Sequence, residues 1–256
     1  MLELKNIDVA AIDSNGESVE ILKDINLTLE NSKIYVVTGP NGGGKTSLAK
    51  AIIGIYPVTS GSISLDGEEI CEKPITQRAS MGVGYAFQSP TRFKGLKVRE
   101  FLSIAAQTDD ETTLFALLVD VGLCAQDYID REMNASFSGG ELKRIEIASV
   151  LARKLRVAVF DEPEAGIDLW SFQKLTETFR RLNETSDTTI VIISHQERIL
   201  RLADEVIVIS GGRVSEITSP EKILGEIEFN DEDCKTCPRC TERYLRSSVN
   251  EGVGVS

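Results

Sequence analysis

The segment IYVVTGPNGGGKTS, residues 34–47, decides the fold class of this chain. Its apolar first part, residues 34–38, predicts a buried strand, and residues 45–53 predict the helix that follows. The residues between them fit the phosphate-loop pattern G-x-x-x-x-G-K-[ST]. Glycines let the backbone turn tightly and point its N–H groups at a phosphate, and a helix N-terminus adds positive partial charge. The predicted nucleotide-binding residues here are Gly39, Pro40, Asn41, Gly42, Gly43, Gly44, Lys45, Thr46 and Ser47.

Two side chains of this loop have distinct expected roles. Lys45 reaches the β- and γ-phosphates, and the Thr46 hydroxyl ligates Mg²⁺. The alternative is a glycine-rich turn with a chance lysine, which the strand before the loop and the helix after it disfavour. By itself, the loop indicates only a phosphate-loop nucleotidase.

Strands alternate with helices along the chain, which predicts a mostly parallel sheet covered on both faces. A glycine pair separates the last two strands, which predicts a hairpin. The predicted strands are 2–10, 21–29, 34–38, 61–65, 81–87, 157–160, 189–193, 205–209 and 213–217. Helical patterns cover 45–53, 98–122, 140–152 and 169–182.

Composition narrows the partners and the compartment. The chain has 256 residues and a formal net charge of −12, which makes nucleic acid a poor default partner. No run approaches the roughly 20 apolar residues of a membrane-spanning helix, and the start lacks a signal-peptide pattern. We therefore expect a cytoplasmic protein, one that docks on a membrane protein if it serves a transporter. The five cysteines do not indicate a disulfide framework.

A carboxylate pair follows the strand at 157–160. Asp161 at the end of such a strand holds the Mg²⁺ shell in phosphate-loop enzymes. Its neighbour Glu162 is placed to polarise the attacking water. The pair is weak evidence alone, because many strands end in acidic turn residues, but the phosphate loop strengthens it.

The segment Phe137-Ser138-Gly139-Gly140-Glu141 narrows the class further. It resembles the signature of the ATP-binding-cassette family, which usually reads Leu-Ser-Gly-Gly-Gln and opens a helix before the acidic strand. The resemblance implies that Ser138, Gly139 and Gly140 bind the γ-phosphate of ATP held by a second subunit. A helix N-terminus with Ser138 as cap and Glu141 as its capping-box partner is the plainer interpretation, and both can hold.

Three further residues match the family's motifs in the family's order. Gln88 fits the glutamine that contacts Mg²⁺ or water and senses the helical lobe. Asp168, after Ala165-Gly166-Ile167, fits the loop that crosses the dimer interface, and it is also a plausible helix N-cap. His195 fits the switch histidine that contacts the γ-phosphate, and it is the only histidine in the chain.

The resemblance covers residues 1–225 and implies an α/β fold. It implies a phosphate-loop ATPase with a RecA-like core sheet, an antiparallel β subdomain and a helical subdomain at about 90–155. It also implies a head-to-tail dimer that hydrolyses ATP with Mg²⁺, with Glu162, His195 and Gln88 as catalytic residues. The competing class is a non-hydrolysing, ATP-gated binding module, which the full catalytic set disfavours.

One departure from the family concerns the adenine base. The family usually has an aromatic residue upstream of the phosphate loop that stacks on adenine. Residues 10–25 contain no Phe, Tyr or Trp. Either an aliphatic residue such as Ile12 or Val19 covers the base, or stacking is absent.

Within the family, several segments resemble the ATPase of the Suf iron–sulfur cluster assembly machinery, which docks on a scaffold pair instead of a membrane protein. They are 86–90, followed by Gly95 and 101–102, then 137–147 and 195–200. Pro163 departs from that pattern and is common in transporter cassettes, so a subunit that pairs with transmembrane permeases is the alternative.

The C-terminal extension, residues 226–256, contains Cys234, Cys237 and Cys240. Their C-x₂-C-x₂-C spacing resembles part of a four-cysteine cluster-binding run, with the fourth ligand missing. The thiolates would hold zinc or an iron–sulfur cluster with an outside ligand. The alternative is a reduced, exposed tail with no metal.

Overall fold

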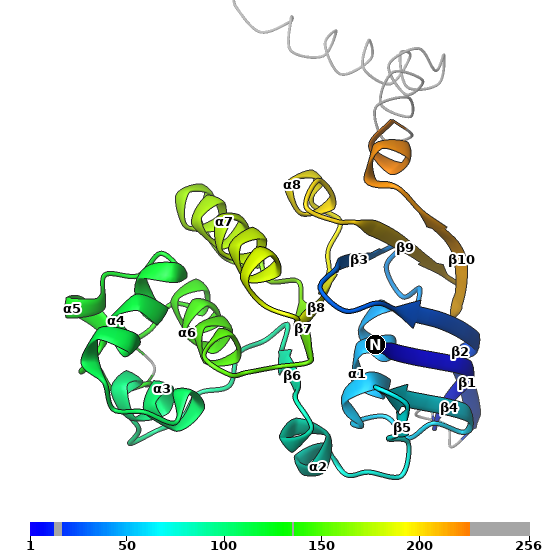
Figure 1. Cartoon of the computed structure of the whole chain (residues 1–256), viewed down its shortest axis with the longest axis horizontal. Coiled ribbons are helices and arrows are strands. Elements are labelled where there is room, and N and C mark those ends of the chain that lie inside the picture. The colour runs from blue at the N-terminus through cyan, green and yellow to red at the C-terminus, as the bar shows by residue number, and fades with distance from the viewer. Residues whose placement is uncertain (13–16, 135, 226–256) are drawn as a thin grey trace, which may run out of the picture.

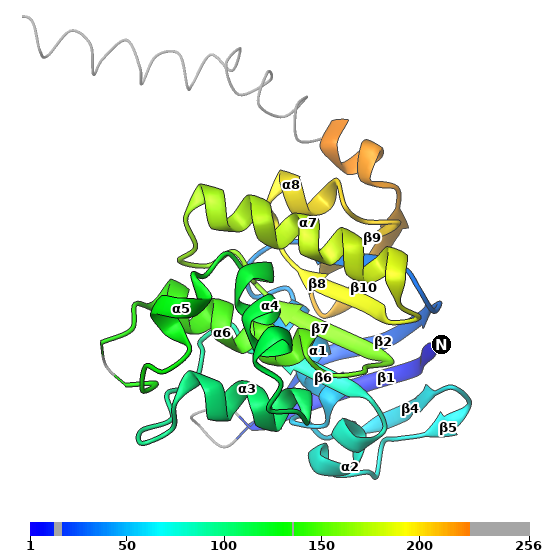
Figure 2. The same ribbon diagram turned by 60° about the vertical axis from the view of Figure 1, so that its left-hand side comes forward.

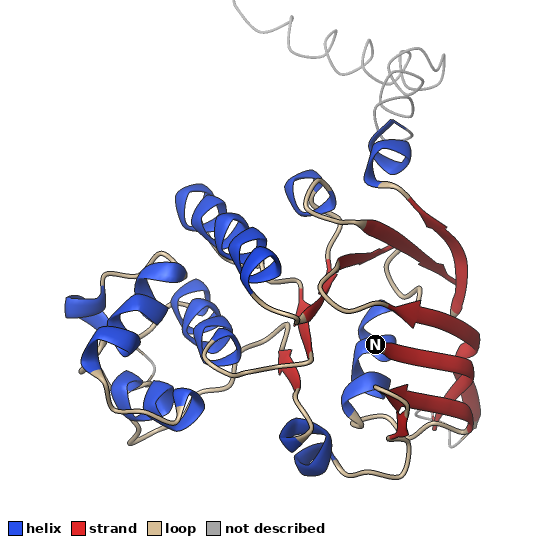
Figure 3. Cartoon of the chain, in the orientation of Figure 1, coloured by secondary structure: helices blue, strands red, loops and turns tan. Residues whose placement is uncertain are grey.

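The computed structural model describes residues 1–12, 17–134 and 136–225, and it contains two sheets. The larger sheet has the strand order β10-β9-β3-β8-β7-β6, in which β9, β3, β8, β7 and β6 run parallel and β10 pairs antiparallel with β9 (Figures 1 and 3). Its strands are β3 (Ile34–Thr38), β6 (Val83–Ala86), β7 (Val157–Asp161), β8 (Thr189–Ile193), β9 (Glu205–Ser210) and β10 (Arg213–Thr218).

The smaller sheet is antiparallel and has the order β2-β1-β4-β5. Its strands are β1 (Leu2–Ile12), β2 (Ser18–Leu29), β4 (Ser60–Leu65) and β5 (Glu68–Glu69). Helix α1 (Lys45–Ile53) lies between this sheet and the larger one (Figure 1). The α/β fold class with a parallel core sheet and a separate antiparallel sheet is therefore confirmed.

The central strands are apolar along their whole length because their two faces enter different cores. On β3, Ile34 and Val36 pack into the core shared with the large helices, while Tyr35 and Val37 pack into the core shared with α1 and the antiparallel sheet. Strands β7 and β8 divide their residues in the same alternating way. This pattern is what a strand buried on both faces requires.

Helices α3 to α6 gather on one side of the large sheet, and α7 lies beside them over β7 and β8 (Figures 1 and 2). These helices are α3 (Val98–Ala106), α4 (Glu111–Asp120), α5 (Ala125–Tyr128), α6 (Gly139–Leu151) and α7 (Leu169–Thr185). Their apolar faces form one cluster with Phe160 and Ile190 of the sheet. The helical part of the chain thus shares its core with the sheet.

The helical pattern predicted over 98–122 is confirmed, but it is divided between two helices instead of forming one. Helix α3 ends at Ala106, and its C-cap Gln107 adopts a left-handed φ of 55°. Helix α4 starts afresh from Asp110, whose side chain accepts a hydrogen bond from the Thr113 N–H. Two short helices, α2 (Ile75–Ser80) and α8 (Glu197–Leu200), were also not expected from the sequence.

No helix in the described ranges has the length and apolar character needed to cross a membrane.

Candidate functional site

The phosphate loop joins β3 to α1, as predicted, and its glycines are required by its shape. Gly39, Gly42 and Gly44 have φ values of 132°, 75° and 111°, which side chains rarely tolerate. A Cβ atom on Gly39 would lie 2.1 Å from the Ile209 carbonyl oxygen. The loop therefore packs directly against the end of β9, and a larger residue there would displace it.

Lys45 is buried in the loop that it follows. Its Nζ donates hydrogen bonds to the carbonyl oxygens of Gly39 and Pro40, at 2.7 and 2.9 Å. A cavity of about 280 Å³ opens beside it. The cavity is lined by Ile21, by Asn41, Gly42, Gly43, Gly44, Lys45, Thr46 and Ser47, and by Gln88 and Glu162. Four separate chain segments thus meet around one cavity.

Thr46 and Asp161 form an oxygen-rich corner at the base of this cavity. The Thr46 hydroxyl donates to Asp161 Oδ1 at 3.3 Å, and the Tyr85 hydroxyl donates to Asp161 Oδ2 at 2.8 Å. Asp161 is fully buried, and burial raises its pKa. Hydroxyl and carboxylate oxygens are the ligands that Mg²⁺ prefers, so these residues fit that ion. A bound cation would favour the charged form of Asp161.

Glu162 follows Asp161 and turns toward the cavity. It has a left-handed φ of 45°, which is unusual for a residue other than glycine. Its N–H donates to the Ile193 carbonyl at 3.0 Å, and its Oε2 accepts from Gln88 Nε2 at 2.7 Å. The structure therefore brings together two of the three predicted catalytic side chains, Glu162 and Gln88.

His195, the third predicted catalytic residue, is exposed directly after β8. It is not among the residues that line the cavity. Its neighbour Ser194 is buried and donates to Glu164 Oε1 at 2.5 Å. The end of β8 is therefore fixed, while the imidazole itself is open to solvent.

The signature segment lies at the N-terminus of α6. Ser138 caps the helix by accepting from the Glu141 N–H at 3.2 Å, and Glu141 accepts from the Ser138 N–H at 2.7 Å, so the predicted capping box is confirmed. Gly140 is buried against the loop after β7, where an added Cβ would lie 2.1 Å from the Gly166 carbonyl oxygen. Ser138 and Gly139 are exposed and do not line the cavity of their own chain.

Asp168 caps helix α7, as the sequence predicted. Its Oδ1 accepts hydrogen bonds from the N–H groups of Trp170 and Ser171, at 3.1 and 3.0 Å. The bonds from Ser171 lower the pKa of this carboxyl. Asp168 therefore fixes the loop of residues 165–168 beside the signature, whatever else it contacts.

The residue that reaches the cavity at the phosphate loop from β2 is Ile21. The sequence had suggested Ile12 or Val19. Val19 is 48% exposed and does not line the cavity, and the Ile12 side chain lies outside the described residues. Side chains alternate between the two faces of β2, so Leu22 in the core places Ile21 on the opposite face. This alternation could have identified Ile21 from the sequence.

Sequence reasoning also missed Tyr85 and Lys143. Tyr85 binds Asp161, and burial raises its pKa. Lys143 is only 1% exposed and contacts the ends of β6 and β7. A lysine three residues before a glutamate on the buried face of a helix was the available signal for Lys143.

The three C-terminal cysteines, Cys234, Cys237 and Cys240, lie outside the described residues. Within 1–12, 17–134 and 136–225, no group of three or more His, Cys, Asp or Glu side chains is arranged to hold a metal ion.

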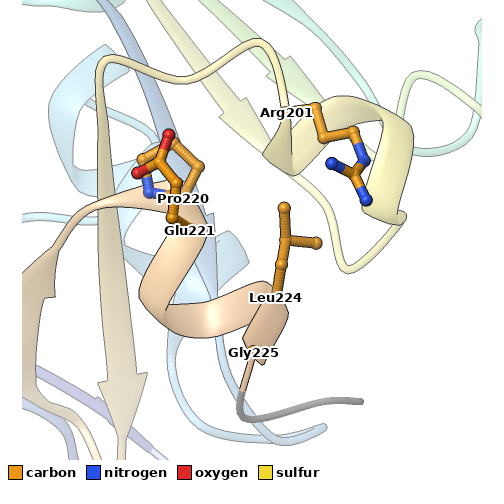
Figure 4. A pocket seen from close by; sticks show the side chains of 5 residues that line it. All are labelled: Arg201, Pro220, Glu221, Leu224 and Gly225. Carbon is orange, nitrogen blue, oxygen red and sulfur yellow. The ribbon is translucent and has the colours of Figure 1, made fainter.

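The described part of the chain also contains cavities larger than the one at the phosphate loop. One, of about 360 Å³, lies between α8 and the end of the described chain and is lined by Arg201, Pro220, Glu221, Leu224 and Gly225 (Figure 4). The other, of about 460 Å³, lies where α2, α3 and α6 end. Neither gathers the predicted nucleotide residues, so cavity size does not identify the site.

Comparisons with known proteins find relatives over most of the chain. A family model described as ABC transporter matches residues 22–165. An uncharacterised ABC transporter ATP-binding protein, MJ0035 of Methanocaldococcus jannaschii, is 37% identical over 227 residues, which cover 85% of this chain and 89% of that protein. The probable ATP-dependent transporter ycf16 of Cyanophora paradoxa is 30% identical over 245 residues, which cover 90% of this chain and 94% of that one.

Among solved structures, a dimeric post-hydrolysis state of the ATP-binding cassette MJ0796 bound to ADP and Pi has the same fold. It superimposes with a TM-score of 0.78 and covers 86% of this chain and 99% of its own. At 21% identity the likeness concerns the fold alone.

Proposed function

Because the chain belongs to the ABC transporter family of ATP-binding cassettes and is an ATPase, we propose that two copies hydrolyse ATP between them and thereby drive a separate partner protein. The observation that carries this proposal is the cavity at the phosphate loop. It gathers the phosphate-binding glycines, Lys45, Gln88 and Glu162 from distant parts of the chain. Positioning and charge stabilisation supply most of the catalysis in phosphoryl transfer, and this arrangement supplies both.

Residues around the cavity have separate proposed roles in hydrolysis. The backbone N–H groups of residues 39–46 and the Lys45 ammonium bind the phosphates. To do so, Lys45 breaks its hydrogen bonds to the Gly39 and Pro40 carbonyl oxygens. Thr46, Asp161 and Gln88 are the residues that would hold Mg²⁺, whose chemistry is to neutralise charge that develops on the phosphate oxygens. Glu162 accepts a proton from the attacking water and orients it, while Gln88 holds Glu162. His195 donates to the γ-phosphate once nucleotide is bound.

The site of one chain lacks the signature residues, which supports a head-to-tail dimer. Ser138 and Gly139 are exposed at the start of a 13-residue helix, where N–H groups and the helix dipole attract anions. A second copy that presents Ser138, Gly139 and Gly140 to the γ-phosphate would complete the site. Asp168 would reach the interface with them, because Gly166 of the same loop packs on Gly140.

For the partner, the names of the relatives favour a transmembrane permease, in which case this chain is peripheral to the membrane. MJ0035 and ycf16 are named as transporter proteins. Pro163 is consistent with this candidate.

The second candidate is a scaffold of Suf-type iron–sulfur assembly, favoured by the resemblance of segments 86–90, 137–147 and 195–200. Purification of the tagged chain from native lysate, with and without detergent extraction, separates the candidates. Recovery of a membrane permease supports the first, and recovery of a soluble scaffold supports the second.

The cysteine spacing of the C-terminal extension belongs to the scaffold candidate. Cys234, Cys237 and Cys240 supply three thiolates for an iron–sulfur cluster or zinc, with an outside fourth ligand. Anaerobic purification followed by iron and zinc analysis tests this assignment. A preparation free of both metals, while the scaffold is loaded, would remove the cysteine site from the proposal.

The ATPase assignment of Glu162 is tested by steady-state phosphate release from wild type and Glu162→Gln, with and without partner. Wild type should exceed the variant by about 100-fold or more, the usual loss on removing a general base. Both proteins should bind ATP. Equal rates in every partner context would overturn the role of Glu162.

A further inference from the structure

The peptide groups of Phe87 are held by two charged side chains of helix α6. Lys143 Nζ donates to the Phe87 carbonyl oxygen, and Glu146 Oε1 accepts from the Phe87 N–H at 3.2 Å. Phe87 lies one residue beyond β6, whose pairing with β7 ends at Ala86. The sheet therefore ends here, and α6 takes over the hydrogen bonds of the next residue.

Lys143 makes a second bond at the neighbouring strand. Its Nζ also donates to the Asp161 carbonyl oxygen at 2.7 Å. The two carbonyls that Lys143 binds belong to the residues immediately before Gln88 and Glu162. These two side chains are themselves hydrogen-bonded at 2.7 Å, so one ammonium fixes the backbone on both sides of that contact.

Burying Lys143 and Glu146 lowers the free energy of unfolding, so these side chains are not explained by their packing alone. Lys143 is 1% exposed, and burial lowers its pKa. Glu146 Oε2 is buried and has no hydrogen-bond partner among the described residues, and burial raises the Glu146 pKa to about 7. Apolar residues of similar size often pack such positions at no loss of stability. The hydrogen bonds of these two side chains to the Phe87 and Asp161 backbones explain why charged residues occupy these buried positions.

The geometry points to Lys143 and Glu146 as positioning residues that set Gln88 and Glu162 for hydrolysis by clamping the Phe87 peptide to α6. Ser138 caps the N-terminus of α6 and is the residue expected to meet the nucleotide of the second copy. A displacement of α6 on dimer closure would thus move the backbone before Gln88 and before Glu162 together. This inference rests on the proposed function and adds residues that carry the signal within one chain.

The test compares Glu146→Leu with Glu146→Gln in the full-length chain. Leu removes the acceptor for the Phe87 N–H, whereas Gln retains a side-chain oxygen there. We expect Glu146→Leu to lower kcat about tenfold, the equivalent of one hydrogen bond to a charged group, with KM for ATP changed less than about threefold. Glu146→Gln should keep kcat within about threefold of wild type. Ile145→Val on the same helix is the control for loss of stability, and it should leave kcat unchanged.

A double-mutant cycle with Gln88→Ala separates positioning from a general structural defect. If Glu146 acts through Gln88, adding Glu146→Leu to Gln88→Ala lowers kcat by less than about twofold, because coupled residues are not additive. If Glu146→Leu still lowers kcat tenfold in the Gln88→Ala variant, the positioning role of Glu146 is wrong. The role is also wrong if Glu146→Gln or Ile145→Val lowers kcat as much as Glu146→Leu does.

The same assay distinguishes failure of the clamp from failure of the proposed function. Wild type and Glu162→Gln are run beside the Glu146 variants. If wild type exceeds Glu162→Gln but equals Glu146→Leu, the ATPase assignment of Glu162 stands and the clamp is wrong. If wild type equals Glu162→Gln, the proposed mechanism itself fails.

Discussion

Substitution of Gly140 by alanine tests the contact between the signature and the loop after β7. An added Cβ at Gly140 would lie 2.1 Å from the Gly166 carbonyl oxygen, whereas real Cβ atoms stay beyond 3.0 Å. The added Cβ is fixed to the backbone, and the Gly166 carbonyl oxygen is itself a backbone atom. The clash therefore cannot be relieved by rotation of a side chain. The start of α6 and the loop of residues 165–168 must therefore separate by about 0.9 Å.

Overpacking of this kind costs roughly 1–3 kcal/mol, and about 2 kcal/mol in a chain of this size corresponds to a Tm lower by about 4–8 °C. The adjacent Gly139→Ala is the matched control, because its Cβ would meet nothing within 4 Å. In the first turn of a helix that change is expected to raise the free energy of unfolding by up to about 1 kcal/mol. Differential scanning calorimetry without nucleotide compares the two variants in the single chain.

A second experiment measures dimer formation in chains that also carry Glu162→Gln. Without the Glu162 carboxylate ATP is hydrolysed slowly, so ATP-bound dimers should accumulate. Size-exclusion chromatography with MgATP should show a dimer that Gly140→Ala weakens, because the Asp168 loop and Ser138 no longer share one surface. ATP binding to the monomer should persist, since the phosphate loop is untouched. A Tm for Gly140→Ala at or above that of Gly139→Ala would refute the close packing described here.

Three further outcomes are expected. Lys45→Ala should lower ATP affinity at least about tenfold in equilibrium titration, because it removes a charge-assisted contact to phosphate, while the fold remains intact by circular dichroism. Thr46→Val should raise the Mg²⁺ concentration needed for half-maximal ATPase activity, and an unchanged Mg²⁺ profile would remove Thr46 from the ion site. The Glu146 pKa is raised from 4.5 to about 7, so its contribution to stability is complete below about 4.5 and is lost as pH rises through 7. Urea midpoints at pH 5 and pH 8 should therefore differ more for wild type than for Glu146→Gln.

Local sequence patterns predicted the parts of the fold that depend on local physics. The apolar runs at 34–38, 157–160 and 189–193 are strands of the larger sheet, because residues buried on both faces leave an uninterrupted apolar signal. The capping box of Ser138 and the cap at Asp168 were also legible, since each is a contact within a few residues.

The missed features depend on contacts between distant residues. The break at Gln107 places a non-glycine residue in a left-handed conformation that its sequence does not demand. Ile21 lines the cavity at the phosphate loop because β2 lies beside that loop. There the Lys23 N–H donates to the Gly212 carbonyl, and the Gly212 N–H donates to the Gly43 carbonyl. The role of Lys143 likewise required β6 and β7 to be side by side.

The apolar core that joins the helical part to the sheet has a mechanical consequence. Leu118 of α4, Ile145 of α6 and Ile190 of β8 belong to one continuous buried cluster. Close-packed interiors resist compression and transmit strain. Helix α6 and strands β7 and β8 share this packed cluster, so a displacement of α6 would strain both strands through it.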